Sequence, residues 1–140
     1  MARVIAIDYG NKRVGLAVTD PDQIIASGLT TIHSSELFDF LTKYFAKEKV
    51  EAIVLGYPRR LNLEANQMTK IVEDLAVSLG RKFPTMKVVK VDERFTSMMA
   101  AQTLVMSGLK KKDRQKKELL DEVAATIILQ SYLDQIRHKL

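Results

Sequence analysis

Three strand-like apolar runs open the chain in close succession, and helical and strand-like patterns alternate after them. The first two runs, residues 3–8 and 13–19, are rich in Val and Ile and flank a short loop in which Gly10 and Asn11 supply turn chemistry. The third run, "QIIASGLTTI", has a break or bend near Gly28. Because successive strands joined by short turns pair as a meander, this opening predicts an antiparallel unit of three strands.

Two further strands are expected at "VEAIVLG" and "MKVVKVD", which are short apolar runs of the kind found in buried strands. Helical spacing of apolar residues begins after Ser34 and Ser35, which are candidate N-caps. Helices are expected over residues 37–45, 65–83, 96–107 and from about 119 to the C-terminus. The order of these elements predicts an α/β fold: a mixed five-stranded sheet that joins the meander to parallel strands, with helices on both faces.

Length and composition favour one domain. A chain of 140 residues with 46% hydrophobic content can bury a sizeable core, so we expect residues 1–140 to form a single domain. The absence of cysteine excludes a disulfide framework and a thiolate zinc site. Asp8 interrupts the first apolar run, and no run approaches the ~18 residues needed to span a bilayer. We therefore expect a cytoplasmic protein with no membrane partner.

The positive charge of the chain is concentrated in one segment. "KKKDRQKK", residues 110–117, carries a net +5, which equals the net charge of the whole chain. Since Gly108 is expected to end the preceding helix, residues 109–118 are predicted to form a flexible basic loop within the domain. Either this loop is a solvated linker, or it contacts a polyanion. The side chains that would make such contacts are Lys110, Lys111, Lys112, Arg114, Lys116 and Lys117.

Acidic residues occur at the ends of three predicted elements. Asp8 ends the first strand, Asp92 and Glu93 end the last, and Asp121 with Glu122 opens the final helix. Each position alone has a structural explanation, because Asp forms turns after strands and carboxylates favour helix N-termini. Together they lie where polar chemistry gathers in such a sheet. Carboxylates that converge there repel one another unless a cation lies between them.

A divalent metal would supply that cation. Oxygen ligands without cysteine and without a histidine pair at ligand spacing favour Mg²⁺ or Mn²⁺. His33 and His138 are far apart in the sequence and are expected to be surface or cap residues. Metals held by a few carboxylates suit phosphoryl chemistry, in which one ion can activate water while another stabilises the leaving oxygen.

Four motifs carry a family resemblance. "AIDYGNKRVGLAVTD", "VLGYP", "VDERFTS" and "LLDEVAATIIL", in this order and spacing, resemble the YqgF family, also called RuvX, which is related to the RuvC Holliday-junction resolvases. The resemblance spans nearly the whole chain. It implies an RNase H-like fold and a metal-dependent nuclease that matures the 5′ end of pre-16S ribosomal RNA. By motif, Asp8, Glu93 and Asp121 would be the catalytic residues and the ligands of Mg²⁺ or Mn²⁺. Asp92 and Glu93 point to opposite faces if both lie on a strand, and the motif selects Glu93.

The resemblance also implies roles in substrate binding. Arg13, Arg94 and Thr96 fall within the matched motifs and are assigned to substrate contact or to support of the site. The loop after "GYP" departs from the family pattern, because it lacks a further glycine and carries Arg59 and Arg60 instead. These two arginines are additional candidates for substrate contact.

Alternative functions stay open at this stage. The same fold could serve a non-catalytic RNA-binding or junction-binding module, or a Holliday junction resolvase acting on branched DNA. Actin-like and Hsp70-like ATPases begin with a similar Asp-x-Gly hairpin near Mg²⁺, but they need a second such domain, which 140 residues cannot supply. The expected partner is nucleic acid, with a ribosomal RNA precursor preferred over branched DNA.

Overall fold

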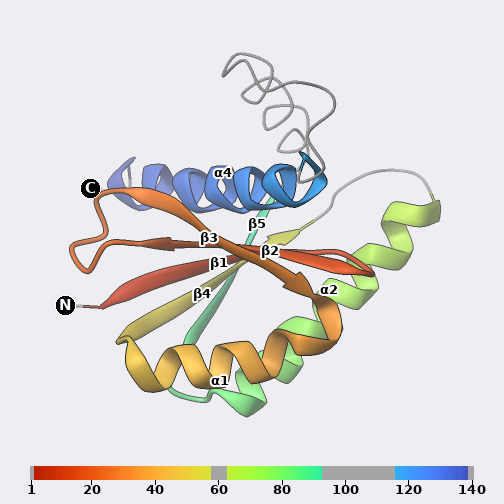
Figure 1. Cartoon of the computed structure of the whole chain (residues 1–140), viewed down its shortest axis with the longest axis horizontal. Coiled ribbons are helices and arrows are strands. Elements are labelled where there is room, and N and C mark those ends of the chain that lie inside the picture. The colour runs from red at the N-terminus through yellow and green to blue at the C-terminus, as the bar shows by residue number, and fades with distance from the viewer. Residues whose placement is uncertain (1, 58–62, 93–115, 139–140) are drawn as a thin grey trace.

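Five strands form one sheet with the order β3-β2-β1-β4-β5 (Figure 1). The computed structural model describes residues 2–57, 63–92 and 116–138, with the backbone alone at 63–67, 92, 116–120 and 138. The strands are β1 (Arg3–Tyr9), β2 (Arg13–Thr19), β3 (Ala26–His33), β4 (Val50–Tyr57) and β5 (Lys87–Asp92). The helical segments are η1 (Ser34–Glu36), α1 (Leu37–Lys47), α2 (Leu63–Lys82) and α4 (Lys116–His138).

The pairing of the strands confirms the predicted mixed sheet. β2 pairs antiparallel with both β1 and β3, so the first three strands form a meander. β4 pairs parallel with β1, and β5 pairs parallel with β4. The carboxyl ends of β1, β4 and β5 therefore lie at one end of the sheet, together with the start of β2.

Side-chain alternation along the strands divides the core into two layers. Ile5 and Ile7 of β1 pack in a cluster with residues of α1 and α2. Val4 and Ala6 of the same strand pack in a second cluster with the buried face of α4. Figure 1 shows this arrangement, with α4 on one face of the sheet and α1 and α2 on the other. The prediction of helices on both faces is confirmed.

The start of α1 differs from the expectation. Ser34 and Ser35 do not cap this helix, because they lie in η1, and Glu36 is the residue that precedes α1 without a side-chain cap bond. His33 caps η1 instead, since its Nδ1 accepts a hydrogen bond from the backbone N–H of Ser35 at 3.1 Å. The prediction that His33 is a cap residue is confirmed. The side chain of His138 lies outside the described residues.

The start of α4 also differs. The helix begins at Lys116, whereas the sequence predicted a start near residue 119 and a loop up to residue 118. Lysine and glutamate are good helix formers, so the like charges of Lys116 and Lys117 do not prevent residues 116–118 from being helical. Asp121 consequently lies in the second turn of α4 and does not open the helix. The helix predicted over residues 96–107 lies outside the described part of the chain.

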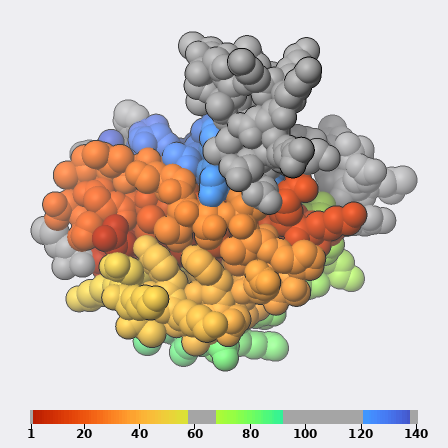
Figure 2. All heavy atoms as spheres, in the orientation of Figure 1, coloured from red at the N-terminus to blue at the C-terminus, as the bar shows by residue number. Residues whose placement is uncertain are grey.

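β3 is an edge strand of the sheet. Figure 2 shows its residues at the surface between α1 and α4. The end of β3 is tied to the turn of the first hairpin, because Ser34 donates hydrogen bonds to the carbonyls of Lys12 and Asn11, at 3.1 Å from its N–H and 2.8 Å from its hydroxyl. In residues 2–57, 63–92 and 116–138, no helix combines the length and hydropathy needed to cross a membrane.

Candidate functional site

A row of three residues crosses the sheet where β1 ends and β2 begins. Asp8 of β1 is paired with Gly15 of β2, and Gly15 is paired with Thr31 of β3. Side-chain direction along β1 places Asp8 on the same face as Val4 and Ala6, which pack against α4. Asp8 and Thr31 are partly buried. The predicted strand-end carboxylate therefore faces α4 rather than open solvent.

The backbone of α4 rests directly on Gly15. A Cβ atom built at Gly15 would lie 2.1 Å from the carbonyl oxygen of Asp121 and 3.0 Å from the Cβ of Asp121. Opposed residues of an antiparallel pair have Cα atoms roughly 5 Å apart, so Asp8 is the cross-strand neighbour of this contact. Asp8 and Asp121, which are 113 positions apart in the numbering of the chain, thus meet at one corner of the sheet.

Asp121 is held by an arginine from the hairpin. The Nε–H of Arg13 donates to Asp121 Oδ2 at 2.8 Å, and the two side chains are 42% and 23% exposed. Arg13 is the first residue of β2 and lies on the same face as Gly15. A cation beside the carboxylates was expected, and in this structure the Arg13 guanidinium is such a cation. The helix-dipole explanation for Asp121 does not apply, because that effect is confined to the first turn.

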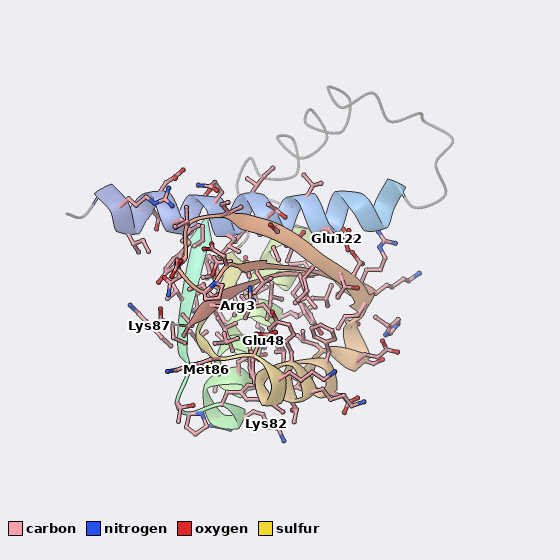
Figure 3. The ribbon with its side chains drawn as sticks, turned by 60° about the vertical axis from the view of Figure 1, so that its left-hand side comes forward. Arg3, Glu48, Lys82, Met86, Lys87 and Glu122 are labelled. Atoms are coloured by element: carbon pink, nitrogen blue, oxygen red, sulfur yellow. The ribbon has the colours of Figure 1, made fainter. Side chains whose placement is uncertain are left out.

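Glu122 follows Asp121 on α4 and lies over the next strand. A Cβ atom at Gly28 of β3 would lie 3.5 Å from the Cβ of Glu122 and 3.6 Å from the Oγ1 of Thr126, which are ordinary contacts. Figure 3 shows Glu122 on α4, well separated from Arg3 at the start of β1 and from Glu48, which follows α1. Two consecutive acidic residues of α4 therefore lie over β2 and β3.

Several predicted site residues lie outside the part of the chain that the structure describes. They are Glu93, Arg94 and Thr96 after β5, Arg59 and Arg60 after β4, and Lys110, Lys111, Lys112 and Arg114 of the basic segment. Lys116 and Lys117 belong to α4, with their backbone alone described. Of the three predicted metal ligands, the structure thus brings together Asp8 and Asp121.

The two described carboxylates fit a site for a hard divalent cation in part. Both offer oxygen, the donor that Mg²⁺ and Mn²⁺ prefer, and both face the corner where α4 contacts Gly15. Within the described residues, His, Cys, Asp and Glu side chains form no group of three suited to hold a metal. The predicted third carboxylate, Glu93, is beyond those residues, so the described pair is compatible with the expected ligand set.

An aromatic residue marks the neighbouring strand end. Tyr57, the last residue of β4, donates a hydrogen bond from its hydroxyl to Glu73 of α2. The ammonium of Lys90 lies 5.3 Å from the centre of the Tyr57 ring. These contacts fix Tyr57 on the α2 face of the sheet, whereas Asp8 faces α4, so Tyr57 is separated from the carboxylate corner by the sheet itself.

The sequence did not identify Gly15 and Thr31 as members of this corner. A signal for Gly15 was available, because an isolated glycine within an apolar strand often marks a close backbone approach. Thr31 carried no such signal, since a threonine in a strand is ordinary. The contact of Arg13 with Asp121 joins residues 108 apart in sequence and could not be inferred from local pattern.

Comparison with known proteins identifies the family. The family model described as "RuvX: Holliday junction resolvase" matches residues 2–135. The chain belongs to the RuvX family. A protein of Flavobacterium johnsoniae is 54% identical over 137 residues, covering 98% of this chain and 99% of that protein, and its name is "Putative pre-16S rRNA nuclease". A protein of Bacteroides fragilis with the same name is 53% identical over 137 residues, with the same coverage.

Solved structures confirm the RNase H-like fold of this RuvX chain. Thermus thermophilus RuvC in complex with a Holliday junction substrate superposes with a TM-score of 0.55 at 14% identity, covering 97% of this chain and 96% of RuvC. The Fowlpox virus resolvase, in complex with substrate Holliday junction DNA, superposes with a TM-score of 0.57 at 17% identity, covering 96% and 98% of the two chains. At these identities the likeness concerns the fold alone.

Proposed function

We propose that this RuvX chain is a metal-dependent nuclease in which Asp8, Glu93 and Asp121 hold Mg²⁺ or Mn²⁺ at the carboxyl end of β1. The observation that carries the proposal is the meeting of Asp8 and Asp121 across Gly15. Hydrolysis of phosphodiester bonds is the activity that follows from membership in the family. The positions of Asp8 and Asp121 add to this activity a proposal for the metal and its ligands.

The third ligand is assigned from strand parity. Val89 and Val91 of β5 pack in the cluster that α4 covers. Position 92 has the opposite parity to these two valines, which argues against Asp92, and the family motif selects Glu93, so we assign Glu93 to the metal.

The carboxylates would act as oxygen ligands on one side of the metal. The chemistry that a divalent ion supplies in such a site is activation of water and neutralisation of charge on the phosphate. Asp8 is fixed by its place in a central strand, and Asp121 by the packing of α4 on β2. Ligands on rigid elements keep their spacing, which favours a reproducible metal geometry.

Of the two roles that the resemblance implies for Arg13, substrate contact and support of the site, its contact with Asp121 favours support. Its guanidinium binds Asp121 through Oδ2, which leaves the second carboxylate oxygen as a ligand atom for the metal. A hydrogen bond to a ligating carboxylate orients that ligand. We therefore assign Arg13 to the support of Asp121 rather than to direct contact with substrate.

The proposed substrate is the precursor of 16S ribosomal RNA, processed near its 5′ end. The support is the identity of more than half of all aligned positions with the two relatives that bear the name of a pre-16S rRNA nuclease. Cleavage of branched DNA is the second candidate, because the superposed resolvases were solved with Holliday junctions. The same carboxylate site serves either substrate.

The basic segment is proposed to guide the phosphate backbone. Its six Lys and Arg side chains directly precede or begin α4, the helix that carries Asp121. Each contact with a single strand should contribute about −0.7 to the slope of log affinity against log salt concentration. Replacing all six by Gln should flatten this slope without changing base preference. An unchanged slope would show that the segment is a solvated linker. Arg59 and Arg60 would then be the next candidates for contact with the phosphate backbone.

The activity is tested by cleavage assays on two substrates. Purified protein is incubated with labelled RNA spanning the 5′ flank of pre-16S rRNA, and in parallel with a four-way DNA junction, each with Mn²⁺ and with chelator. We expect metal-dependent cleavage of the RNA. Cleavage of the junction alone would establish the second candidate, while binding of either substrate without any cleavage would indicate a non-catalytic binding module and contradict the proposal.

A further inference from the structure

We propose that Gly15 is a positioning residue that sets the distance between the carboxylates of Asp8 and Asp121, and thereby the affinity of the site for a divalent metal. The inference rests on the proposed function, because it concerns the same carboxylates. It assigns a role to a residue that has no side chain and therefore cannot itself bind the metal through one.

The first step is the closeness of the contact. A Cβ at position 15 would lie 2.1 Å from the carbonyl oxygen and 2.4 Å from the carbonyl carbon of Asp121. These are backbone atoms of a helix, so no side-chain rotation can relieve the overlap. Any residue other than glycine must move α4 away from β2 at Asp121.

The second step is the direction of that movement. Gly15 is the register partner of Asp8, so the backbone of Asp121 that rests on Gly15 lies beside the strand position of Asp8. Raising α4 here carries Asp121 away from the sheet while Asp8 stays in its central strand. The Arg13 guanidinium, which binds Asp121 at 2.8 Å, would lose its partner in the same movement.

The third step distinguishes this glycine from its neighbour. Gly28 lies under the same helix on β3, but a Cβ there would make contacts of 3.5 and 3.6 Å with side-chain atoms of Glu122 and Thr126. Gly28→Ala is therefore a matched control, with the same chemical change on the same face and under the same helix.

The experiment measures Mn²⁺ affinity by electron paramagnetic resonance on the folded, metal-free protein, without substrate. We expect Gly15→Ala to bind Mn²⁺ about 10-fold more weakly or worse, which is the range for loss of groups that orient metal ligands. Gly28→Ala should bind like wild type. Equal affinities for wild type and Gly15→Ala would overturn the inference.

A second variant covers the case in which Gly15→Ala does not fold. Ala125 lies one turn after Asp121 on the buried face of α4, is 0% exposed and packs in the cluster that includes Ala6 and Ala17. Ala125→Val should raise the helix from its own side and also weaken Mn²⁺ binding. If a folded Ala125→Val variant bound Mn²⁺ with wild-type affinity, the distance between α4 and the sheet would not control metal binding, and the inference would be contradicted.

Asp8→Asn separates this inference from the proposed function. If wild type binds Mn²⁺, Asp8→Asn loses it and Gly15→Ala keeps it, the metal site stands and the role of Gly15 fails. If wild type does not bind Mn²⁺, or Asp8→Asn binds as wild type does, the proposed ligand set fails and the inference falls with it.

Discussion

Two arginine–carboxylate pairs lie at opposite ends of the sheet and differ in their surroundings. At the amino end of β1, Arg3 donates to Glu48 at 3.2 Å and also to the carbonyl of Thr19 at 2.9 Å. At the carboxyl end, Arg13 donates to Asp121 at 2.8 Å, next to the Asp8–Gly15 pair. Arg3 is the more buried arginine, at 26% exposed against 42%, while Asp121 is the more buried carboxylate, at 23% against 43% for Glu48.

The difference distinguishes a contact that joins elements of the fold from one that lies within the proposed metal site. Arg3 joins β1 to the end of β2 and to Glu48, the residue that follows α1, so its bonds hold elements of the fold together. Arg13 neutralises Asp121 of α4, whose backbone packs on Gly15, the register partner of Asp8. A surface pair needs no such constraint, and exposed ion pairs contribute only about 0–1 kcal/mol to stability. The pair of Arg13 and Asp121 is therefore better explained by the orientation of the Asp121 carboxylate than by a contribution to stability.

The largest effect is expected at the end of β5. Glu93→Gln should lower metal-dependent cleavage about 100-fold or more, because it removes a proposed metal ligand. Asp92→Asn, the matched control one residue earlier, should cleave at close to the wild-type rate. Cleavage rates of the two variants under identical Mn²⁺ concentrations decide between the residues. The reverse result would show that the strand parity has been assigned with the wrong register.

The two arginines should differ in stability and in rescue by metal. Arg3→Gln should lower the free energy of unfolding by about 1.5–3 kcal/mol, since a charged donor to a partly buried carbonyl is lost. Arg13→Gln should cost about 0–1 kcal/mol without metal. Saturating Mn²⁺ should restore the stability of Arg13→Gln, because a metal replaces the missing cation, but not that of Arg3→Gln.

Urea unfolding with and without Mn²⁺ measures both arginine variants. Arg3→Gln should also retain wild-type cleavage. Arg13→Gln should need a higher Mn²⁺ concentration to reach the same cleavage rate, because Asp121 is less well oriented. Equal rescue of the two variants by Mn²⁺ would mean that the metal binds elsewhere, and the contrast between the two ends of the sheet would be lost.

The smallest effect is expected at Asp20, in the turn between β2 and β3 at the amino end of β1. Hydrogen bonds from the backbone N–H groups of Ile25 and Ile24 lower the pKa of Asp20 below its usual value. A lowered pKa stabilises the fold above the pKa of the unfolded chain, and this contribution is lost as pH falls through the folded value, below about 4.

Asp20→Asn removes this pH dependence while retaining an acceptor oxygen. The variant should be slightly less stable than wild type at pH 7, and the difference should shrink as pH falls below about 4. Urea unfolding across this range measures it. Cleavage should be unaffected, and a stability difference that is constant with pH would show that the charge of Asp20 does not contribute.

Much of the fold could be predicted because periodicity is local. The strand runs and two of the helices followed from alternation and helical spacing, and β2 matched its expected bounds of 13–19. The capping of α1 could not be predicted from Ser34 and Ser35, since the chain forms η1 before the helix. The early start of α4 was missed because a run of like charge was interpreted as loop, although its residues favour helix.

The candidate site was predictable in part. Asp8 and Asp121 were selected by their positions at element ends and by motif, and the structure brings them to one corner. The cation expected between carboxylates was assigned to a metal, and the structure adds Arg13 from the hairpin. An isolated glycine within an apolar strand indicates a close backbone approach, but local pattern does not identify the partner of Gly15, which is a helix over a hundred residues later.

The most direct test of the central claim is a paired measurement on Asp8→Asn: the rate of Mn²⁺-dependent cleavage and the metal-free free energy of unfolding. We expect cleavage to fall about 100-fold or more, while stability stays at the wild-type value or rises, because one of two repelling carboxylates is gone. Unfolding of the variant, or cleavage near the wild-type rate, would assign Asp8 a structural role and contradict the proposed metal site.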